Sequence, residues 1–340
     1  MGGKALKGEN TFTRRYSKQE FETVSQELVD ILLKTFKRAE IPMYFSTKES
    51  FGDIDIIVSM EGTPVANLKE YINETFKPNE ISHNGNAWSF DYKEVQVDFI
   101  TCSEEDFDSN RHYLAYNDLG NFIGRITQKM GLKYGQEGLW YNHYFKKQKI
   151  GKVMISKDYP KIFEFLGFDY NRWLEGFETL EDVFEYVIAN KQFDSNMFEL
   201  QHLNKINRER NAKRKSYMSF LEYIHENHSD KKFFYESDKS IYTDRANKFF
   251  PDARMTEQIR ELEYKHCKKL YIKSKFSGGV VMLRYGLQGK ELGNALRGFK
   301  DFINNKICKV VKWGDYNEFI LNEPTDIIYE TFELFYNKYL

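Results

Sequence analysis

Cysteine and proline are scarce in this chain, with 3 Cys and 6 Pro among 340 residues. Cys102, Cys267 and Cys308 lie far apart and match no zinc-ligand or disulfide spacing. This excludes a disulfide-rich framework and indicates a reducing, cytoplasmic compartment. No apolar run approaches the roughly 18 residues that a membrane-spanning helix needs, so we expect no membrane partner. The N-terminal residues MGGKALKGENTFTRRYS lack the apolar core of a secretory signal.

An excess of charge of one sign is also missing, because 50 Lys and Arg residues nearly balance 51 Asp and Glu residues. Any affinity for nucleic acid must therefore come from local basic patches. Hydrophobic residues make up 41% and charged residues 30% of the chain, which is typical of a globular protein rather than a disordered one. The length allows two or three domains.

The N-terminal half alternates helical and extended patterns. We expect residues 1–16 to form a flexible basic lead-in. Ser17 and Glu20 have the spacing of a capping box, and helical apolar spacing follows as far as Phe36. Three further patterns predict a strand over 53–58, a helix over about 65–76, and a β-hairpin with strands over 87–92 and 95–100.

The C-terminal half is mostly helical in pattern from about residue 118. The stretch from Lys268 to Tyr285 instead alternates like a strand or hairpin around Gly278 and Gly279. A helical stretch over 205–215 carries six cations against a single acid: Lys205, Arg208, Arg210, Lys213, Arg214 and Lys215. This basic stretch is either a solvated helix face or a surface that follows nucleic-acid phosphates.

Three aspartates form the most informative pattern. Asp53 and Asp55 are two residues apart on one expected strand, so their side chains point to the same face. Asp98 ends a hairpin strand and would stand beside them if that strand pairs with the first. Converging carboxylates repel one another and require a cation, for which Mg²⁺ or Mn²⁺ is the ion that oxygen ligands suit. The alternative is the solvated face of an amphipathic strand.

The chain resembles the DNA polymerase beta superfamily of nucleotidyltransferases in segments that follow the same order. The first segments are ESFGDID at 49–55 and VQVDFI at 95–100; those at 121–140 and 151–167 resemble family X DNA polymerases in particular. The resemblance implies an α+β fold, in which a nucleotidyltransferase palm with a mixed β-sheet and helices on one side precedes a mostly helical C-terminal region. The expected division is a palm over 17–145, a thumb-like segment over 146–200 and a nucleic-acid-binding domain over 201–340.

The resemblance also implies roles for single residues. Asp53 and Asp55 would bind both metal ions, and Asp98 would hold the ion that activates a primer 3′-hydroxyl and help to take its proton. Gly52 would let the backbone approach a nucleoside triphosphate. The candidates for the sugar and base pocket are Tyr113, Tyr116 and Asn117, which could equally be surface and core residues of a loop.

Two segments depart from the family. It usually places Gly-Ser at the head of the loop before the aspartates, whereas residues 42–48 read PMYFSTK, so Ser46 and Lys48 are the candidates for phosphate contacts. Residues 285–296 look weakly like a segment of CCA-adding enzymes and poly(A) polymerases, although a tight turn before a helix would give the same glycines.

The sequence therefore predicts a metal-dependent nucleotidyltransferase that adds nucleotides from NTP or dNTP to a nucleic-acid 3′-hydroxyl. Tailing of RNA or tRNA ends is favoured by the missing lyase domain of family X polymerases and by the glycines of residues 285–296, whereas the resemblance over 121–167 favours a DNA polymerase. A family X-like DNA polymerase is the alternative. A second alternative is a catalytically degenerate nucleic-acid-binding module, against which the retention of all three aspartates argues.

Overall fold

The structure is a computed structural model that describes residues 5–9, 11–310 and 313–339. The chain divides into two compact units, of which the first is Met1–Asn142 with Lys152–Met255 and the second is His143–Gly151 with Thr256–Leu340. The roles expected for the palm, the thumb-like segment and the nucleic-acid-binding domain stay predictions. No helix in the described ranges combines the length and apolarity needed to cross a membrane.

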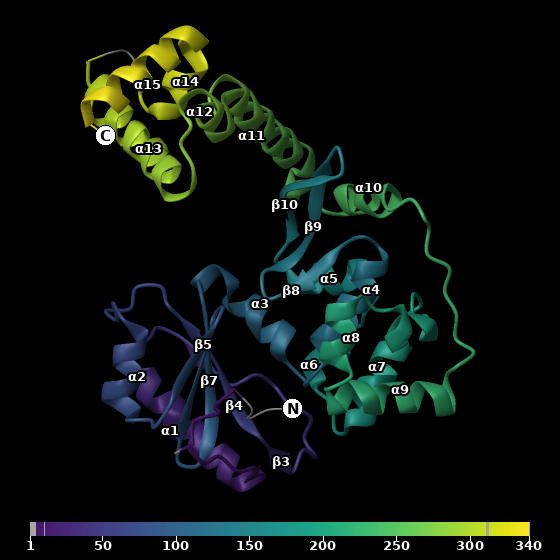
Figure 1. The fold of residues 1–340 in the computed structure, drawn as a ribbon. Coiled ribbons are helices and arrows are strands. Elements are labelled where there is room, and N and C mark those ends of the chain that lie inside the picture. The colour runs from purple at the N-terminus through teal and green to yellow at the C-terminus, as the bar shows by residue number, and fades with distance from the viewer. Residues whose placement is uncertain (1–4, 10, 311–312, 340) are drawn as a thin grey trace. The chain divides into compact units, whose positions relative to one another are not determined.

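A five-stranded sheet forms the N-terminal part of the first unit (Figure 1). Its strand order is β2-β4-β7-β6-β5. β4 and β7 run parallel, whereas the other neighbouring strands are antiparallel. The expected α+β class with a mixed sheet is confirmed. The elements of this part are β1 (Tyr16–Ser17), α1 (Lys18–Leu32), β2 (Ala39–Glu40), β3 (Ser50–Phe51), β4 (Asp53–Ser59), α2 (Leu68–Phe76), β5 (Ile81–Asn84), β6 (Ala87–Tyr92), β7 (Val95–Cys102) and α3 (Glu104–Leu114).

Alternation along β4 and β7 separates an apolar face of this sheet from a polar one. Every second residue of β4 points toward α1 and α2, which pack on the same face because each helix has an apolar stripe. The alternate residues of β4 point to the opposite face of the sheet, and the first two of them are Asp53 and Asp55. The core under the two helices includes Phe21, Leu28, Leu32, Ile54, Ile56, Ile72, Val97 and Phe99.

Local signals placed the start of α1 and the turn of the β6–β7 hairpin correctly, but not the end of α1. The Ser17 hydroxyl accepts from the Glu20 N–H, and the Glu20 carboxylate accepts from the Ser17 N–H, as the capping box predicts. α1 ends at Leu32, so Phe36 lies beyond the helix but is still buried. The hairpin from β6 to β7 turns through Lys93 and Glu94, both with positive φ, as a tight hairpin turn requires.

The described part of the N-terminal segment is attached to the sheet. The Ala5 N–H donates to the Gln96 side-chain oxygen at 2.9 Å, and the Gly8 N–H donates to the Glu80 carboxylate at 2.7 Å. Tyr16 is buried, and β1 pairs with β3. The segment predicted as a flexible lead-in therefore brings its own residues to the loop that precedes β4.

A second, three-stranded sheet interrupts the region that the sequence pattern indicates as mostly helical. Its order is β10-β9-β8, with β8 and β9 antiparallel. The prediction was incomplete here. Buried residues such as Leu139 and Tyr141 alternate with less buried ones over too short a stretch to be distinguished from a helical pattern. The elements are α4 (Leu119–Lys129), β8 (Lys133–Gly135), β9 (Gly138–Phe145), β10 (Gln148–Ser156), α5 (Tyr159–Leu166), α6 (Tyr170–Glu175), α7 (Leu180–Ile188), η1 (Ser195–Phe198) and η2 (Leu200–His202).

The basic stretch is not one continuous helix. α8 ends at Asn211, and Ala212 to Arg214 connect it to α9, which begins at Lys215. The cations therefore do not share one helix face. The elements that complete the first unit are α8 (Lys205–Asn211), α9 (Lys215–Asn227), α10 (Ser240–Phe249) and η3 (Pro251–Ala253).

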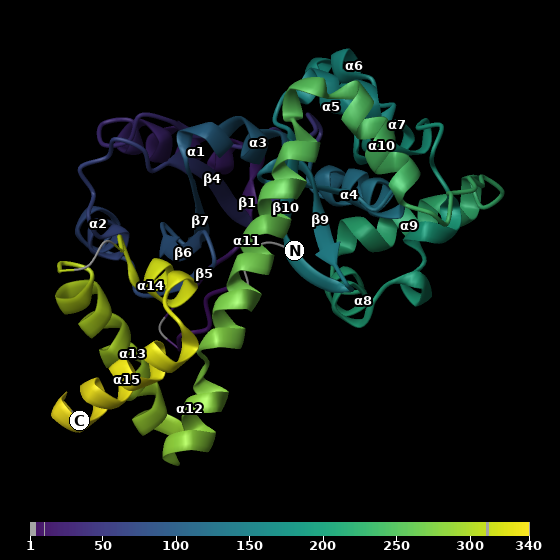
Figure 2. The ribbon, with the colours of Figure 1, turned by 90° about the horizontal axis from the view of Figure 1, so that it is seen from above.

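The second unit is helical apart from the tip of the β9–β10 hairpin, and the strand or hairpin expected over 268–285 is wrong. Its apolar residues Ile272, Phe276, Val281 and Tyr285 recur at about helical spacing and pack on one core. Figure 2 shows α11 as a long helix leading to the bundle of α12–α15. The elements are α11 (Met255–Lys275), α12 (Gly278–Tyr285), α13 (Gly289–Phe302), η4 (Ile303–Ile307), α14 (Tyr316–Asn322) and α15 (Thr325–Tyr339).

The glycines over 286–293 have a local structural reason. Gly286 ends α12 with φ +71° and Gly289 has φ +53° at the start of α13, a left-handed conformation that glycine adopts readily. A tight turn between two helices thus accounts for both of them. The resemblance of this segment to CCA-adding enzymes and poly(A) polymerases gains no support from the fold.

Candidate active site

Three aspartates meet on the polar face of the five-stranded sheet, and we call them the aspartate triad. β4 presents Asp53 and Asp55, and the parallel register places Asp98 of β7 directly opposite Asp55. One carboxylate oxygen from each residue lies within 4.8 Å of the others. The convergence expected from their spacing is therefore present. The binding of a metal ion to these three residues stays a prediction.

Burial makes the charged form of this triad costly. Burial raises the pKa of Asp55 well above its ordinary value, and the charges of Asp53 and Asp98 raise it further. Burial likewise raises the pKa of Asp98 to about 6, although a hydrogen bond from Ser89 lowers it. Carboxylates that are this close together and half-buried are stabilised in the charged form by a cation, which removes the mutual repulsion.

Gln96 orients the Asp98 carboxylate. Its side-chain nitrogen donates to both Asp98 oxygens, at 2.9 and 3.0 Å. Its side-chain oxygen accepts from the Ala5 N–H at 2.9 Å, and Gln96 itself is buried. The amide is thus fixed at both ends. Sequence reasoning missed this residue, although its position two residues before Asp98 on β7 places it on the same face of the sheet.

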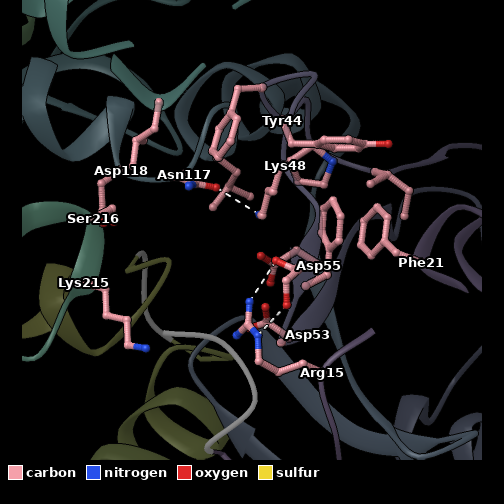
Figure 3. Close-up of a pocket in the computed structure, with 18 of the residues that line it drawn as sticks. Arg15, Phe21, Tyr44, Lys48, Asp53, Asp55, Asn117, Asp118, Lys215 and Ser216 are labelled. Carbon is pink, nitrogen blue, oxygen red and sulfur yellow. Dashed lines mark hydrogen bonds between the residues drawn. The ribbon is translucent and has the colours of Figure 1, made fainter. Parts of the chain in front are cut away.

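A cavity of about 1020 Å³ opens in front of Asp53 and Asp55, as Figure 3 shows. Its polar lining comes from the N-terminal segment, the loop before β4, the residues after α3 and the start of α9. Gly52, which the resemblance places near a triphosphate, lies in this lining. Asp98 does not line the cavity itself but lies next to Asp53 and Asp55, which do.

Lys48 supplies a cation to the wall that faces the aspartates. Its Nζ donates to the Asn117 side-chain oxygen at 3.1 Å and lies 4.6 Å from the centre of the Phe51 ring. Burial lowers the pKa of Lys48, whereas Asp53 and Asp55 act in the opposite direction. The structure thus brings together two of the residues predicted for nucleotide binding, Lys48 and Asn117.

The start of α9 forms another wall of the cavity. Arg214 is ion-paired with the buried Asp118, whose carboxylate also accepts from the Ser216 hydroxyl. Figure 3 shows Lys215 across the cavity from Asp53 and Asp55. α9 is anchored behind this wall by its buried residues Tyr217, Phe220, Leu221 and Ile224.

Three other predicted nucleotide-binding residues do not reach the cavity. The Ser46 hydroxyl donates to a backbone carbonyl at 3.4 Å. Tyr116 is buried, and its hydroxyl donates to the Trp173 carbonyl at 3.2 Å. Tyr113 packs against the Tyr134 ring, with 5.9 Å between ring centres. Tyr116 and Asn117 both have positive φ, and this turn sends the tyrosine inward while the asparagine reaches the cavity.

Most of the basic stretch also lies away from the cavity. Of its six cations, only Arg214 and Lys215 line it. Arg208 donates to a backbone carbonyl at 3.1 Å, and Arg210 donates to Asn121 at 2.9 Å. The remaining cations, which are exposed, are Lys205 and Lys213. Their role in nucleic-acid binding stays a prediction.

Arg15 is a cavity residue that sequence reasoning missed. Its guanidinium donates to the Ser50 hydroxyl and the Ser50 carbonyl, both at 2.8 Å, and it lines the cavity beside the aspartates. The pairing of β1 with β3 brings it there. Because that pairing joins residues distant in the chain (Tyr16 to Phe51 and Ser17 to Ser50), no local pattern predicts it. Ser216 and Ser219 of α9 are further lining residues that were missed.

Comparison with known proteins gives only a partial likeness. No protein-family model and no curated protein matches this sequence. Among solved structures, the chain is similar to Leishmania infantum polymerase beta in a ternary gap complex, with 13% identity and a TM-score of 0.32 over 39% of this chain and 53% of that one. The chain is also similar to Leishmania infantum polymerase beta in a ternary P/T complex, with 14% identity and a TM-score of 0.32 over 39% of this chain and 60% of that one.

The chain thus spans less than two thirds of the structures that it matches, 53% and 60% of their lengths. At this extent the likeness says nothing about function. Function must be inferred from the geometry of the aspartate triad and the cavity.

Proposed function

We propose that this protein is a metal-dependent nucleotidyltransferase, which moves a nucleotide from an NTP or dNTP to a 3′-hydroxyl of nucleic acid. The observation that carries the proposal is the aspartate triad, three carboxylate oxygens within 4.8 Å of one another beside a cavity of about 1020 Å³. That volume is at the upper end for small-molecule sites. An RNA end is the acceptor that the sequence favours, and a DNA primer is the alternative.

The donor set of the triad fits a hard divalent cation. Carboxylate oxygens are the ligands of Mg²⁺ and Mn²⁺, whereas no His or Cys belongs to the triad. Asp53, Asp55 and Asp98 would hold the ion. When bound, such ions neutralise developing charge on a phosphoryl group and lower the pKa of a coordinated hydroxyl.

The remaining chemistry falls to the chain's own residues. In the proposed reaction the acceptor 3′-oxygen forms a bond to the α-phosphorus, the bond from that phosphorus to the β-phosphate oxygen breaks, and pyrophosphate leaves. The proton of the 3′-hydroxyl passes to an Asp98 carboxylate oxygen, which Gln96 holds in place. Because Asp98 lies outside the cavity lining, the acceptor would approach from the β7 side while the nucleotide occupies the cavity.

The cations of the cavity wall are placed to receive the phosphates. Lys48 and Arg15 lie on the side of the aspartates, and Lys215 lies across from them (Figure 3). Arg214 is already ion-paired with Asp118, so its charge orients the start of α9 rather than standing free for a ligand. These residues replace the Gly-Ser loop that the sequence lacks.

A non-catalytic binding module is the competing function. It would gain nothing from three half-buried carboxylates within 4.8 Å of one another, because like charges at that distance destabilise the fold unless a cation joins them. A chain that had lost catalysis could replace Asp55 by a neutral residue and become more stable. The retained triad therefore favours the enzyme.

The test is nucleotide incorporation by the full chain. The protein is incubated with Mg²⁺ or Mn²⁺, with each labelled NTP and dNTP in turn, and with a panel of RNA, tRNA-like and DNA 3′ ends, alone or annealed to templates. We expect extension that requires the divalent cation, and the extended strand identifies the acceptor. Strand binding without incorporation on any end would favour the binding module instead.

Lys215 is expected to contribute to nucleotide affinity. The Lys215→Met variant should raise the KM for the incorporated nucleotide about tenfold, equivalent to roughly 1.4 kcal/mol, with a smaller change in kcat. The matched control is Lys213→Met, which removes an equal charge two residues away from a side chain that is exposed and does not line the cavity. Equal KM values for the two variants would show that Lys215 does not face the phosphates.

A further inference from the structure

A short segment near the N-terminus, residues 5–9, lies against the face of the five-stranded sheet that carries the aspartate triad. The Ala5 N–H donates to the Gln96 side-chain oxygen at 2.9 Å. Gln96 is on the same face as Asp98, because the two are separated by two positions on β7. We call residues 5–9 the N-terminal strap, and the reaction proposed above gives it no role.

Glu80 anchors the N-terminal strap a few residues further along. Its carboxylate accepts from the Gly8 N–H at 2.7 Å and from the Lys7 N–H at 3.0 and 3.1 Å. The hydrogen bonds from Gly8 and Lys7 lower the pKa of Glu80, because they favour its charged form. A Cβ on Gly8 would lie 3.0 Å from a Glu80 carboxylate oxygen, so glycine allows the backbone to approach this closely.

The sheet register brings Glu80 close to Gln96. The Glu80 N–H donates to the Asp91 carboxylate at 2.8 Å, and the antiparallel pairing of β6 with β7 places Asp91 opposite Gln96. The N-terminal strap therefore runs from Gln96 on β7 to Glu80 just before β5. Side chains from two separate parts of the sheet thus hold it in place, one by an amide oxygen and the other by a charge.

The hydrogen bond from Ala5 decides which end of the Gln96 amide faces Asp98. A side-chain amide has an oxygen that accepts and a nitrogen that donates, and the two ends have nearly the same shape. Because the Ala5 N–H requires the oxygen, the nitrogen donates to both Asp98 oxygens. Gln96 is only 2% exposed, so without Ala5 its oxygen would be unpaired away from water, which favours a different orientation of the side chain.

We propose that Glu80 is a positioning residue for the aspartate triad, which acts through the N-terminal strap and Gln96 to hold the Asp98 carboxylate in the orientation that binds a cation. Removing a group that orients a metal ligand commonly weakens metal binding about 10- to 100-fold. A group one step further from the ligand should have a smaller effect in the same direction. The inference rests on the proposed function, because it requires that the triad binds a cation. A strap that only stabilises the sheet predicts no change in cation affinity.

The test measures Mg²⁺ binding by the full chain, stripped with EDTA and dialysed, as the rise in melting temperature with added Mg²⁺ and without nucleotide or nucleic acid. Ala5→Pro removes the N–H that holds Gln96, and Glu80→Ala removes the anchor. Each should raise the Mg²⁺ dissociation constant about fivefold, and Gln96→Met should raise it about tenfold or more. Adding Glu80→Ala to Gln96→Met should cause no further loss, because the N-terminal strap then has no amide to orient.

Two matched controls accompany these variants. Glu74→Ala removes an equal charge from an exposed residue of α2. Glu9→Pro adds a proline to the N-terminal strap where proline fits, because the Thr11 N–H donates to the Gly8 carbonyl at 3.0 Å and makes Glu9 the second residue of a turn. Both controls should keep the Mg²⁺ dissociation constant within about twofold of the wild-type value.

The proposal would be overturned if Glu80→Ala bound Mg²⁺ like Glu74→Ala, or if the losses of Glu80→Ala and Gln96→Met added fully in the double variant. Amide hydrogen exchange at Lys7 and Gly8 should be faster in metal-free Glu80→Ala than in the wild type, and unchanged exchange would equally rule out the anchor. In these outcomes the proposed enzyme stands. A wild type whose melting temperature does not respond to Mg²⁺ would instead overturn the cation site of the proposed function, and this inference with it.

Discussion

Replacing Asp55 by Asn is expected to reduce nucleotide incorporation at least about 1,000-fold while the protein stays folded. Asn has the same shape but removes one negative ligand of the aspartate triad, and loss of a ligand that holds the metal costs several kcal/mol of transition-state stabilisation. In the absence of divalent cations the same variant should be more stable than the wild type, because it removes a buried charge between Asp53 and Asp98.

The two effects are measured in one preparation, as the single-turnover incorporation rate and as the melting temperature in EDTA. The matched control is Asp91→Asn, since Asp91 is buried on the neighbouring strand β6 and accepts from the Asn79 amide at 2.7 Å and the Glu80 N–H at 2.8 Å. Asp91 lies outside the triad, so its variant should keep the incorporation rate within a few-fold and lose stability. An Asp55→Asn protein that incorporates nucleotides at the wild-type rate would contradict the proposed enzyme.

The stability of the metal-free protein is expected to fall as the pH rises from about 4 to about 6. The pKa of Asp98 is raised from 3.8 to about 6 in the folded protein. Between these values the folded state keeps a proton that the unfolded chain has released. Stability from this group is therefore present below pH 4 and is lost as the pH passes 6. The loss is of the order of 3 kcal/mol, at about 1.4 kcal/mol for each pH unit.

This pH dependence is measured as the free energy of unfolding in EDTA for the wild type and for Asp98→Asn, because the difference between them removes the contribution of other groups. A Gln96→Met variant should move the loss to higher pH, since two hydrogen bonds that favour the charged carboxylate disappear. Identical pH profiles for the wild type and Asp98→Asn would show that Asp98 does not titrate in this range.

Divalent cations should restore the stability that the metal-free protein loses as the pH rises. Mg²⁺ at about 100 times its dissociation constant is expected to stabilise the wild type by about 2.7 kcal/mol. The effect should be larger at pH 7.5 than at pH 5.5, because bound metal competes with protons for the same oxygens. The Asp98→Asn variant should show a much smaller response. An equal Mg²⁺ response in that variant would place the cation elsewhere on the protein.

Local sequence patterns were sufficient for much of the first unit. The capping box at Ser17 and the two-residue alternation of β4, β6 and β7 are short-range signals, and each confirmed element follows from one of them. The same signals were misleading over 268–285, where a few alternating apolar residues fit a strand as well as the helices α11 and α12. Only packing on the core of the second unit distinguishes the two.

The lining of the cavity depended on contacts between residues distant in the chain. Arg15 reaches it because β1 pairs with β3, and Lys215 reaches it because the buried stripe of α9 fixes that helix within the first unit. Tyr116 looked like a cavity residue, but a left-handed backbone turns its ring into the core. No spacing in the sequence carries this information, because it arises from pairings and turns that form only in the folded chain.

The sequence by itself determined that Asp53 and Asp55 share one face, since the side-chain period of a strand leaves them no other arrangement. Tertiary structure alone decided that Asp98 stands opposite Asp55, because the parallel register of β4 and β7 is a long-range choice. It also decided that Gln96 holds the Asp98 carboxylate and that the cations of the wall come from three separate parts of the chain. The alternation of side chains along β4 placed Asp53 and Asp55 on one face. The packing of distant segments of the chain then assembled the rest of the site around them.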